Sequence, residues 1–103
     1  MPPVAAFVMD EALRCAARVH CKDMAENAYF DHTSQNGDTH TSRARKAGSS
    51  ASSENIASGQ RSPASVMSSW MSSPGHCKNI MQGGHKRVGI GYYNNMWTML
   101  LGG

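Results

Sequence analysis

The sequence predicts a single α+β domain in which helices pack on a small antiparallel sheet. Two observations predict it: a long amphipathic helical segment lies near the start of the chain, and an alternating hairpin rich in β-branched and aromatic residues lies at its end. A length of 103 residues is typical of one domain, so we assign residues 1–103 to one unit. The apolar content of 40% is enough for a globular core.

Residues 7–28 form the strongest helical segment. A stripe of mostly small apolar residues follows the helical period, and charged residues lie opposite. The stripe comprises Ala12, Leu13, Ala16, Ala17, Val19, His20 and Met24, and the charged face comprises Glu11, Arg14, Arg18 and Lys22. The small residues predict close approach of another element.

Residues 29–61 lack sustained periodicity. The segment SQNGD at 34–38 indicates a turn. Residues 41–48 predict a short helix with Thr41 or Ser42 as N-cap and Gly48 as its stop. Residues 49–53 read as a polar loop that leads directly into ENIASG.

A second helix is predicted from Pro63, with Ser62 as N-cap and Pro74-Gly75 as its end. Its apolar face comprises Val66, Met67, Trp70 and Met71. Residues 86–93 and 96–102 then predict two strands joined by the Asn94-Asn95 turn.

Composition disfavours several function classes. The net charge is +3, but the ten Lys and Arg are scattered, and no aromatic residue interleaves the densest run, RARK at 43–46, which argues against nucleic-acid binding. No apolar run approaches the ~18–20 residues that cross a bilayer. Residues 1–10 lack the features of a signal peptide.

The three cysteines, Cys15, Cys21 and Cys77, allow at most one disulfide within the chain. Cys15 and Cys21 lie on different faces of one predicted helix, so any bridge includes Cys77, and the spacing does not choose its partner. No CxxC pair indicates a zinc finger.

His32, Glu54 and His76 are the candidate site residues, because each lies beside a structural break in a compact motif: YFDH, SENIA and SPGH. Two imidazoles and a carboxylate are ligand types that Zn²⁺ prefers, and the same trio suits general acid–base catalysis. The alternative is a half-buried hydrogen-bond network with a purely structural role.

The other histidines carry simpler interpretations. His20 lies on the apolar stripe and is interpreted as a buried core residue, whereas His40 and His85 are expected to be solvated. No GxSxG motif marks a serine nucleophile, and a thiol enzyme is disfavoured because adjacent His and Cys side chains point apart.

Taken in order, six segments resemble the CAP superfamily, also called the SCP-like extracellular domain, in its bacterial form. The resemblance covers nearly all of the chain and includes LRCAARVHCKDMAENAYFDHTSQNG, RARKAG, SENIASGQRSP, SSWMSSPGHCKNIM, VGIGYY and WTMLLG. It implies an α-β-α sandwich.

In this family two His and two Glu converge in a cleft, and in some members the histidines hold a divalent ion. The resemblance implies that His32 and His76 are these histidines, with Zn²⁺ or another divalent cation as the expected cofactor, and that Glu54 is the acid of the GENI motif. The second Glu falls near Ser73 here, and Ser53 replaces the motif's glycine. The resemblance also favours a Cys15–Cys77 disulfide, with Cys21 as a free thiol.

The family's usual first helix is missing here, and residues 1–7 look like the link that would follow it; self-association is one way to cover the exposed face. The resemblance implies a secreted domain that binds a lipid, a small ligand or a partner protein. The alternative is a metal-assisted peptide or ester hydrolase, with His32 and His76 on the metal and Glu54 as candidate general base.

Overall fold

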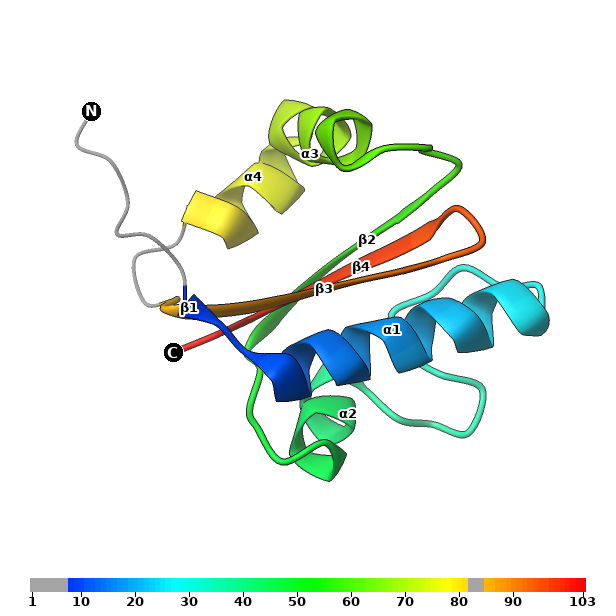
Figure 1. The fold of residues 1–103 in the computed structure, drawn as a ribbon, viewed down its shortest axis with the longest axis vertical. Helices are drawn as coiled ribbons and strands as arrows, with labels where there is room; N and C mark the ends of the chain where they lie inside the picture. Colours follow the sequence, from blue (N-terminus) through cyan, green and yellow to red (C-terminus); the bar gives the residue numbers. More distant parts are fainter. Residues whose placement is uncertain (1–7, 82–84) are drawn as a thin grey trace.

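In the computed structural model, which describes residues 8–81 and 85–103, a four-stranded sheet lies between two pairs of helices (Figure 1). The strands lie in the order β1 (Val8–Met9), β3 (Arg87–Tyr93), β4 (Met96–Gly102) and β2 (Ser53–Ser58). One face carries α1 (Glu11–Glu26) and α2 (His40–Lys46), and the other carries α3 (Pro63–Ser72) and α4 (Pro74–Met81) (Figure 1). This arrangement confirms the predicted α+β fold and the α-β-α sandwich.

The predicted C-terminal hairpin is confirmed. Strands β3 and β4 pair antiparallel up to Tyr93 and Met96, and the turn residues Asn94 and Asn95 have φ of 51° and 65°. Positive φ at both turn positions matches the right-handed twist of a hairpin, and Asn tolerates it.

Strand β1 pairs parallel with β3, so the sheet is mixed. The prediction of a purely antiparallel sheet is wrong at this edge. Val8 and Met9 fall in the segment 7–28 that was predicted as helix, whereas α1 begins only at Glu11. Two residues are too few to show a strand period.

Glycines on β3 allow α1 to lie directly on the sheet. A Cβ at Gly89 would overlap the backbone of Leu13 and Arg14, and one at Gly91 would overlap that of Ala17 and Arg18. The alanines of α1 provide the matching flat surface, which confirms the close approach predicted from the small-residue stripe.

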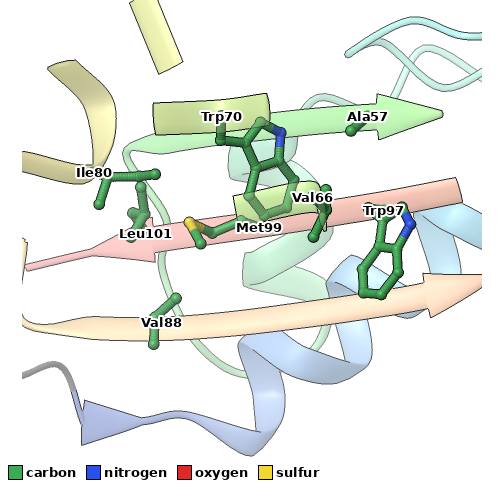
Figure 2. Close-up of a cluster of buried hydrophobic side chains, with 8 residues drawn as sticks. All are labelled: Ala57, Val66, Trp70, Ile80, Val88, Trp97, Met99 and Leu101. Carbon is green, nitrogen blue, oxygen red and sulfur yellow. The ribbon is translucent and has the colours of Figure 1, made fainter. Parts of the chain in front are cut away.

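The opposite face of the sheet carries the aromatic core (Figure 2). Trp70 of α3 packs over Met99 of β4, while its indole Nε1 donates to the carbonyl of Ile56, 3.2 Å away. The cluster comprises Ala57, Val66, Trp70, Ile80, Val88, Trp97, Met99 and Leu101. Each large apolar side chain buried here contributes about 1.5–3 kcal/mol, so this face fixes α3 and α4 firmly on the sheet.

Besides β1, two elements escaped the sequence prediction. Strand β2 lies where a loop and ENIASG were predicted, and its residues 54–57 are all buried, so no polar–apolar alternation marks it. Helix α4 begins at Pro74, one residue beyond the Ser73 C-cap of α3. Proline ends one helix but also suits the first turn of the next, which is why the pattern looked like a stop.

Smaller differences concern boundaries and exposure. Helix α2 begins one residue earlier than predicted, with Thr39 as N-cap. Val19 and Met71 were placed on buried stripes but are 57% and 43% exposed. Residues 1–7, the predicted link, lie outside the described residues.

The expected Cys15–Cys77 disulfide is not formed. All three cysteines are free thiols. Cys15 lies on α1 and Cys77 on α4, and these helices cover opposite faces of the sheet (Figure 1), so the sheet separates the two sulfurs. The prediction that Cys15 and Cys21 lie on different faces of one helix is confirmed, since Cys15 is exposed and Cys21 is buried.

Within the described ranges, no helix combines the length and the apolar character that a membrane crossing requires.

Candidate functional site

A buried carboxylate is the centre of the candidate site. Glu54 extends from the edge strand β2 with a side chain only 1% exposed, and Arg43 of α2, 4% exposed, donates through Nη2 to its Oε2. Burial alone raises the pKa of a carboxyl group, but the hydrogen bond from His32 and the charge of Arg43 outweigh burial and lower the pKa of Glu54. Glu54 is therefore ionised at neutral pH and fully paired.

His32 forms the exposed side of this cluster. Its Nδ1 donates to Oε1 of Glu54 over 2.8 Å, and its side chain is 52% exposed. This hydrogen bond raises the pKa of His32 above its ordinary value, against a smaller effect of desolvation. Because Nδ1 is held by Glu54, the other ring nitrogen, Nε2, is the one available to a ligand.

A pocket of about 290 Å³ opens beside this pair. All of its lining residues are polar, and they come from α2, α4, the start of β2 and the loop after α1: His32, His40, Ser52, Ser53, Glu54 and Asn79. The pocket lies at the outer edge of β2, the last strand of the sheet. The sequence predicted a polar cleft formed by His32, Glu54 and His76; the first two line this pocket, whereas His76 is not among its lining residues.

Arg43 links the cluster to a second, deeper hydrogen-bond network. Its Nη1 donates to Ser34 Oγ over 2.8 Å, and Ser34 Oγ lies 3.4 Å from Nδ1 of His20. The Nε2–H of His20 donates to the carbonyl of Asp31, 2.7 Å away. Burial lowers the pKa of His20, and the charge of Arg43 lowers it further, so His20 is a neutral, satisfied core histidine as predicted.

His76 contributes its backbone to the site region. Its carbonyl accepts from Asn55 Nδ2 over 3.2 Å, while Asn79 Nδ2 donates to Asn55 Oδ1 over 3.0 Å. Asn79, one turn later on α4, is the residue of this helix that lines the pocket. The structure thus brings His32 and Glu54 together and places Asn79 beside them.

The residues predicted to bind a metal ion do not form a three-ligand cluster. Among residues 8–81 and 85–103, no three His, Cys, Asp or Glu side chains are grouped so that they could hold a metal ion. Zinc in proteins normally takes at least three protein ligands. His32, Glu54 and His76 therefore do not form a three-ligand cation site here.

His85 was expected to be solvated, and this prediction is wrong. The side chain is buried, with Nδ1 3.4 Å from Ser52 Oγ and Nε2 3.1 Å from Ser53 Oγ. His40 is half-buried, and its Nε2 lies 3.3 Å from the carbonyl of Ser52. The glycines before His85 suggested an exposed loop, but hydrogen bonds to two serines compensate its burial.

Sequence reasoning missed Arg43, Ser53, Asn79 and His85 as site residues. Arg43 was read as part of a basic run; its position next to Ala44 and Ala47 on a short helix is the signal that it points inward. Asn79 lies three residues after His76, so the two residues share one face of a helix. This spacing would have identified Asn79 had α4 been predicted.

Comparisons with known proteins agree with this fold. The model of the CAP family, described as the Cysteine-rich secretory protein family, matches residues 1–98. The uncharacterized protein YkwD of Bacillus subtilis is 37% identical over 94 residues, a match that covers 87% of this chain and 37% of YkwD.

Three solved structures are similar. An extracellular protein of Bacillus anthracis that contains an SCP domain has a TM-score of 0.90 and 27% identity, covering 95% of this chain and 34% of that one. An outer surface protein of Borrelia burgdorferi (TM-score 0.82, 24% identity, 96% and 78% coverage) and a cysteine-rich secretory protein of Staphylococcus aureus (0.76, 12%, 95% and 32%) share the fold. The chain spans 37% of the length of YkwD and 34% of the Bacillus anthracis protein.

Proposed function

Because the chain belongs to the CAP family, we propose that it is a secreted binding module whose pocket at His32 and Glu54 holds a small polar ligand with an acidic group. The extracellular and outer-surface descriptions of two structural relatives support the secreted location. The observation that carries the proposed ligand chemistry is the charge balance around Glu54.

Arg43 already neutralises Glu54, and the two side chains are buried together. When His32 is protonated, as its raised pKa favours, the cluster has one positive charge in excess on its exposed side. A carboxylate or phosphate in the pocket would accept a hydrogen bond from Nε2–H of His32 and meet this charge. A lipid or partner protein would bind here through such a group.

Inorganic phosphate and acetate are suitable probes. We expect saturable changes in the NMR signals of His32 and Asn79, and we expect His32→Gln to abolish the change at Asn79. Lys46→Gln is the matched control, because Lys46 is an exposed cation on α2 that pairs with Asp38 outside the pocket. Equal loss in both variants, or no saturable change in the wild type, would contradict the proposal.

Metal-assisted hydrolysis is the competing function, with Glu54 as general base. Both Glu54 oxygens already accept hydrogen bonds, one from His32 and one from Arg43, and this favours a role in orienting His32. Chelator-sensitive cleavage of a peptide or ester, lost in Glu54→Gln and in His76→Ala, would replace the binding proposal with this one.

A divalent cation held by His32 and His76 stays a prediction of the family resemblance. Calorimetric titration of Zn²⁺ into the metal-free protein, His32→Ala and His76→Ala tests it. Stoichiometric heat in the wild type that both variants lose would support the two-histidine site. Equal heats in all three proteins would remove the cation from the proposed function.

A further inference from the structure

A serine and a histidine that the proposed function does not use lie within hydrogen-bond distance beside the same pocket. Ser53 Oγ is 3.1 Å from Nε2 of His85, and Ser53 lines the pocket. We propose that Ser53 is a nucleophile activated by His85, and that the pocket cleaves small polar carboxylic esters. The inference rests on the proposed function, because the ester would occupy the same pocket.

The surrounding hydrogen bonds select the required tautomer of His85. Ser52 Oγ donates to the carbonyl of Leu101 at 3.4 Å, so towards Nδ1 of His85, also 3.4 Å away, it acts as an acceptor. Nδ1 then carries the proton, and Nε2 is left to accept from Ser53 Oγ. Ser52 therefore orients His85 as the third member of a hydrolytic triad orients its histidine.

Burial keeps His85 ready to accept a proton. The side chain is only 4% exposed, and this desolvation lowers the pKa of His85 below its ordinary value. The ring is therefore neutral near pH 7, which a general base requires.

The edge position of β2 explains how a substrate reaches both halves of the site. Neighbouring residues of a strand point to opposite faces, so Ser53 and Glu54 point to different sides of the sheet. Because β2 is the outermost strand, a ligand beside its edge meets both side chains, and both line the one pocket. His32 and Asn79 line this pocket too, and both side chains carry N–H groups of the kind that stabilise an oxyanion.

The chemical steps balance with water as the only co-reactant. Ser53 Oγ bonds to the ester carbonyl carbon while its proton passes to Nε2 of His85. The carbon–oxygen bond to the alcohol breaks, and the alcohol leaves with that proton. Water then gives a proton to His85 and attacks the acyl-Ser53 ester, the carboxylic acid departs, and the proton returns to Ser53.

An organophosphorus fluoride and p-nitrophenyl acetate test the inference. We expect the fluoride probe to add one phosphoryl group to Ser53, with loss of fluoride, as seen by intact mass and peptide mapping. Ser53→Ala and His85→Gln should both abolish this label and lower p-nitrophenolate release by at least about tenfold. Ser58→Ala, at the exposed far end of the same strand, is the matched control and should behave as the wild type.

Ser53→Ala removes one hydroxyl group, so it tests the inference even where His85→Gln perturbs folding. An unlabelled wild type, a label on another residue, or unchanged ester turnover in Ser53→Ala would overturn the nucleophile. If phosphate still shifts the His32 signal in that case, the binding proposal stands while this inference falls. If Ser53 is labelled but phosphate binding is absent, Ser53 stands as a nucleophile, and the proposal that the pocket binds an acidic group falls.

Discussion

Arg43 and Glu54 form an ion pair that joins helix α2 to the edge strand β2 and is almost completely withdrawn from water. Removing one partner of such a pair leaves the other charge buried without compensation, at a cost of about 3–5 kcal/mol. We therefore expect Glu54→Gln to lower the free energy of unfolding by about that amount, as measured by urea denaturation followed by circular dichroism.

Glu11→Gln is the matched control for this change. Glu11 pairs with Arg14 over 3.5 Å on the surface of α1, with side chains 83% and 62% exposed. Exposed pairs contribute less than about 1 kcal/mol, so this variant should unfold almost as the wild type does. Equal losses in the two variants would show that the Arg43–Glu54 pair is not the buried anchor inferred from its geometry.

Gly91 is one of two glycines of β3 against which the backbone of α1 lies directly. In Gly91→Ala the new methyl group would overlap the backbone of Ala17 and Arg18, so the helix must move away from β3. We expect a loss of about 3 kcal/mol in the free energy of unfolding, the upper part of the range for overpacked cores. Urea denaturation measures it directly.

Gly75→Ala separates this steric effect from the general effect of replacing glycine. A Cβ at Gly75 meets nothing within 4 Å, and the residue lies in α4, where alanine is the better helix former by up to about 1 kcal/mol. The control should be neutral or stabilising. A Gly91→Ala protein as stable as Gly75→Ala would mean that α1 does not rest on the glycines of β3.

The sequence predicted those parts of the fold in which a local sequence pattern specifies the helix, strand or turn. The amphipathic stripe of α1 and the Asn94-Asn95 hairpin both follow from local spacing, and the structure confirms them. Strand β2 and helix α4 were missed because tertiary contacts decide them. The strand is buried across its middle, and the helix begins at a proline that equally well ends α3.

The site was predictable only in part, for the same reason. His32 and Glu54 were identified through motifs, and they lie 2.8 Å apart at their closest polar atoms. Arg43 and His85 were not identified, because a charged or polar residue is expected at the surface unless its partners are known. Their partners, Glu54 and the serines of β2, come from distant parts of the chain.

His20 and His32 should affect stability with opposite pH dependence. The pKa of buried His20 is lowered from 6.5, so its contribution to stability is lost as the pH falls below the unfolded value. The pKa of His32 is raised, so its contribution is complete below pH 6.5 and is lost as the pH rises through the folded value. Between pH 8 and 5, His20→Gln should therefore flatten the loss of stability on acidification, and His32→Gln should steepen it.

Urea denaturation at several pH values measures both slopes, and NMR titration of the two imidazoles gives their pKa values directly. An apparent pKa of His20 above 6.5, or of His32 below it, would contradict the hydrogen-bond assignments made for these residues.

Cys21 should be inert in the folded protein while Cys15 reacts. The Cys21 thiol donates to Thr98 Oγ1 over 3.1 Å and is completely buried, and burial raises its pKa to about 11. Since the thiolate is the reactive form, a disulfide reagent at pH 8 should modify exposed Cys15 within minutes and Cys21 only after unfolding. Peptide mapping of partly modified protein distinguishes the two. Early modification of Cys21 would show that the contact between α1 and β4 opens. If Cys15 resists the reagent in oxidised protein but reacts after reduction, then Cys15 forms a disulfide in solution.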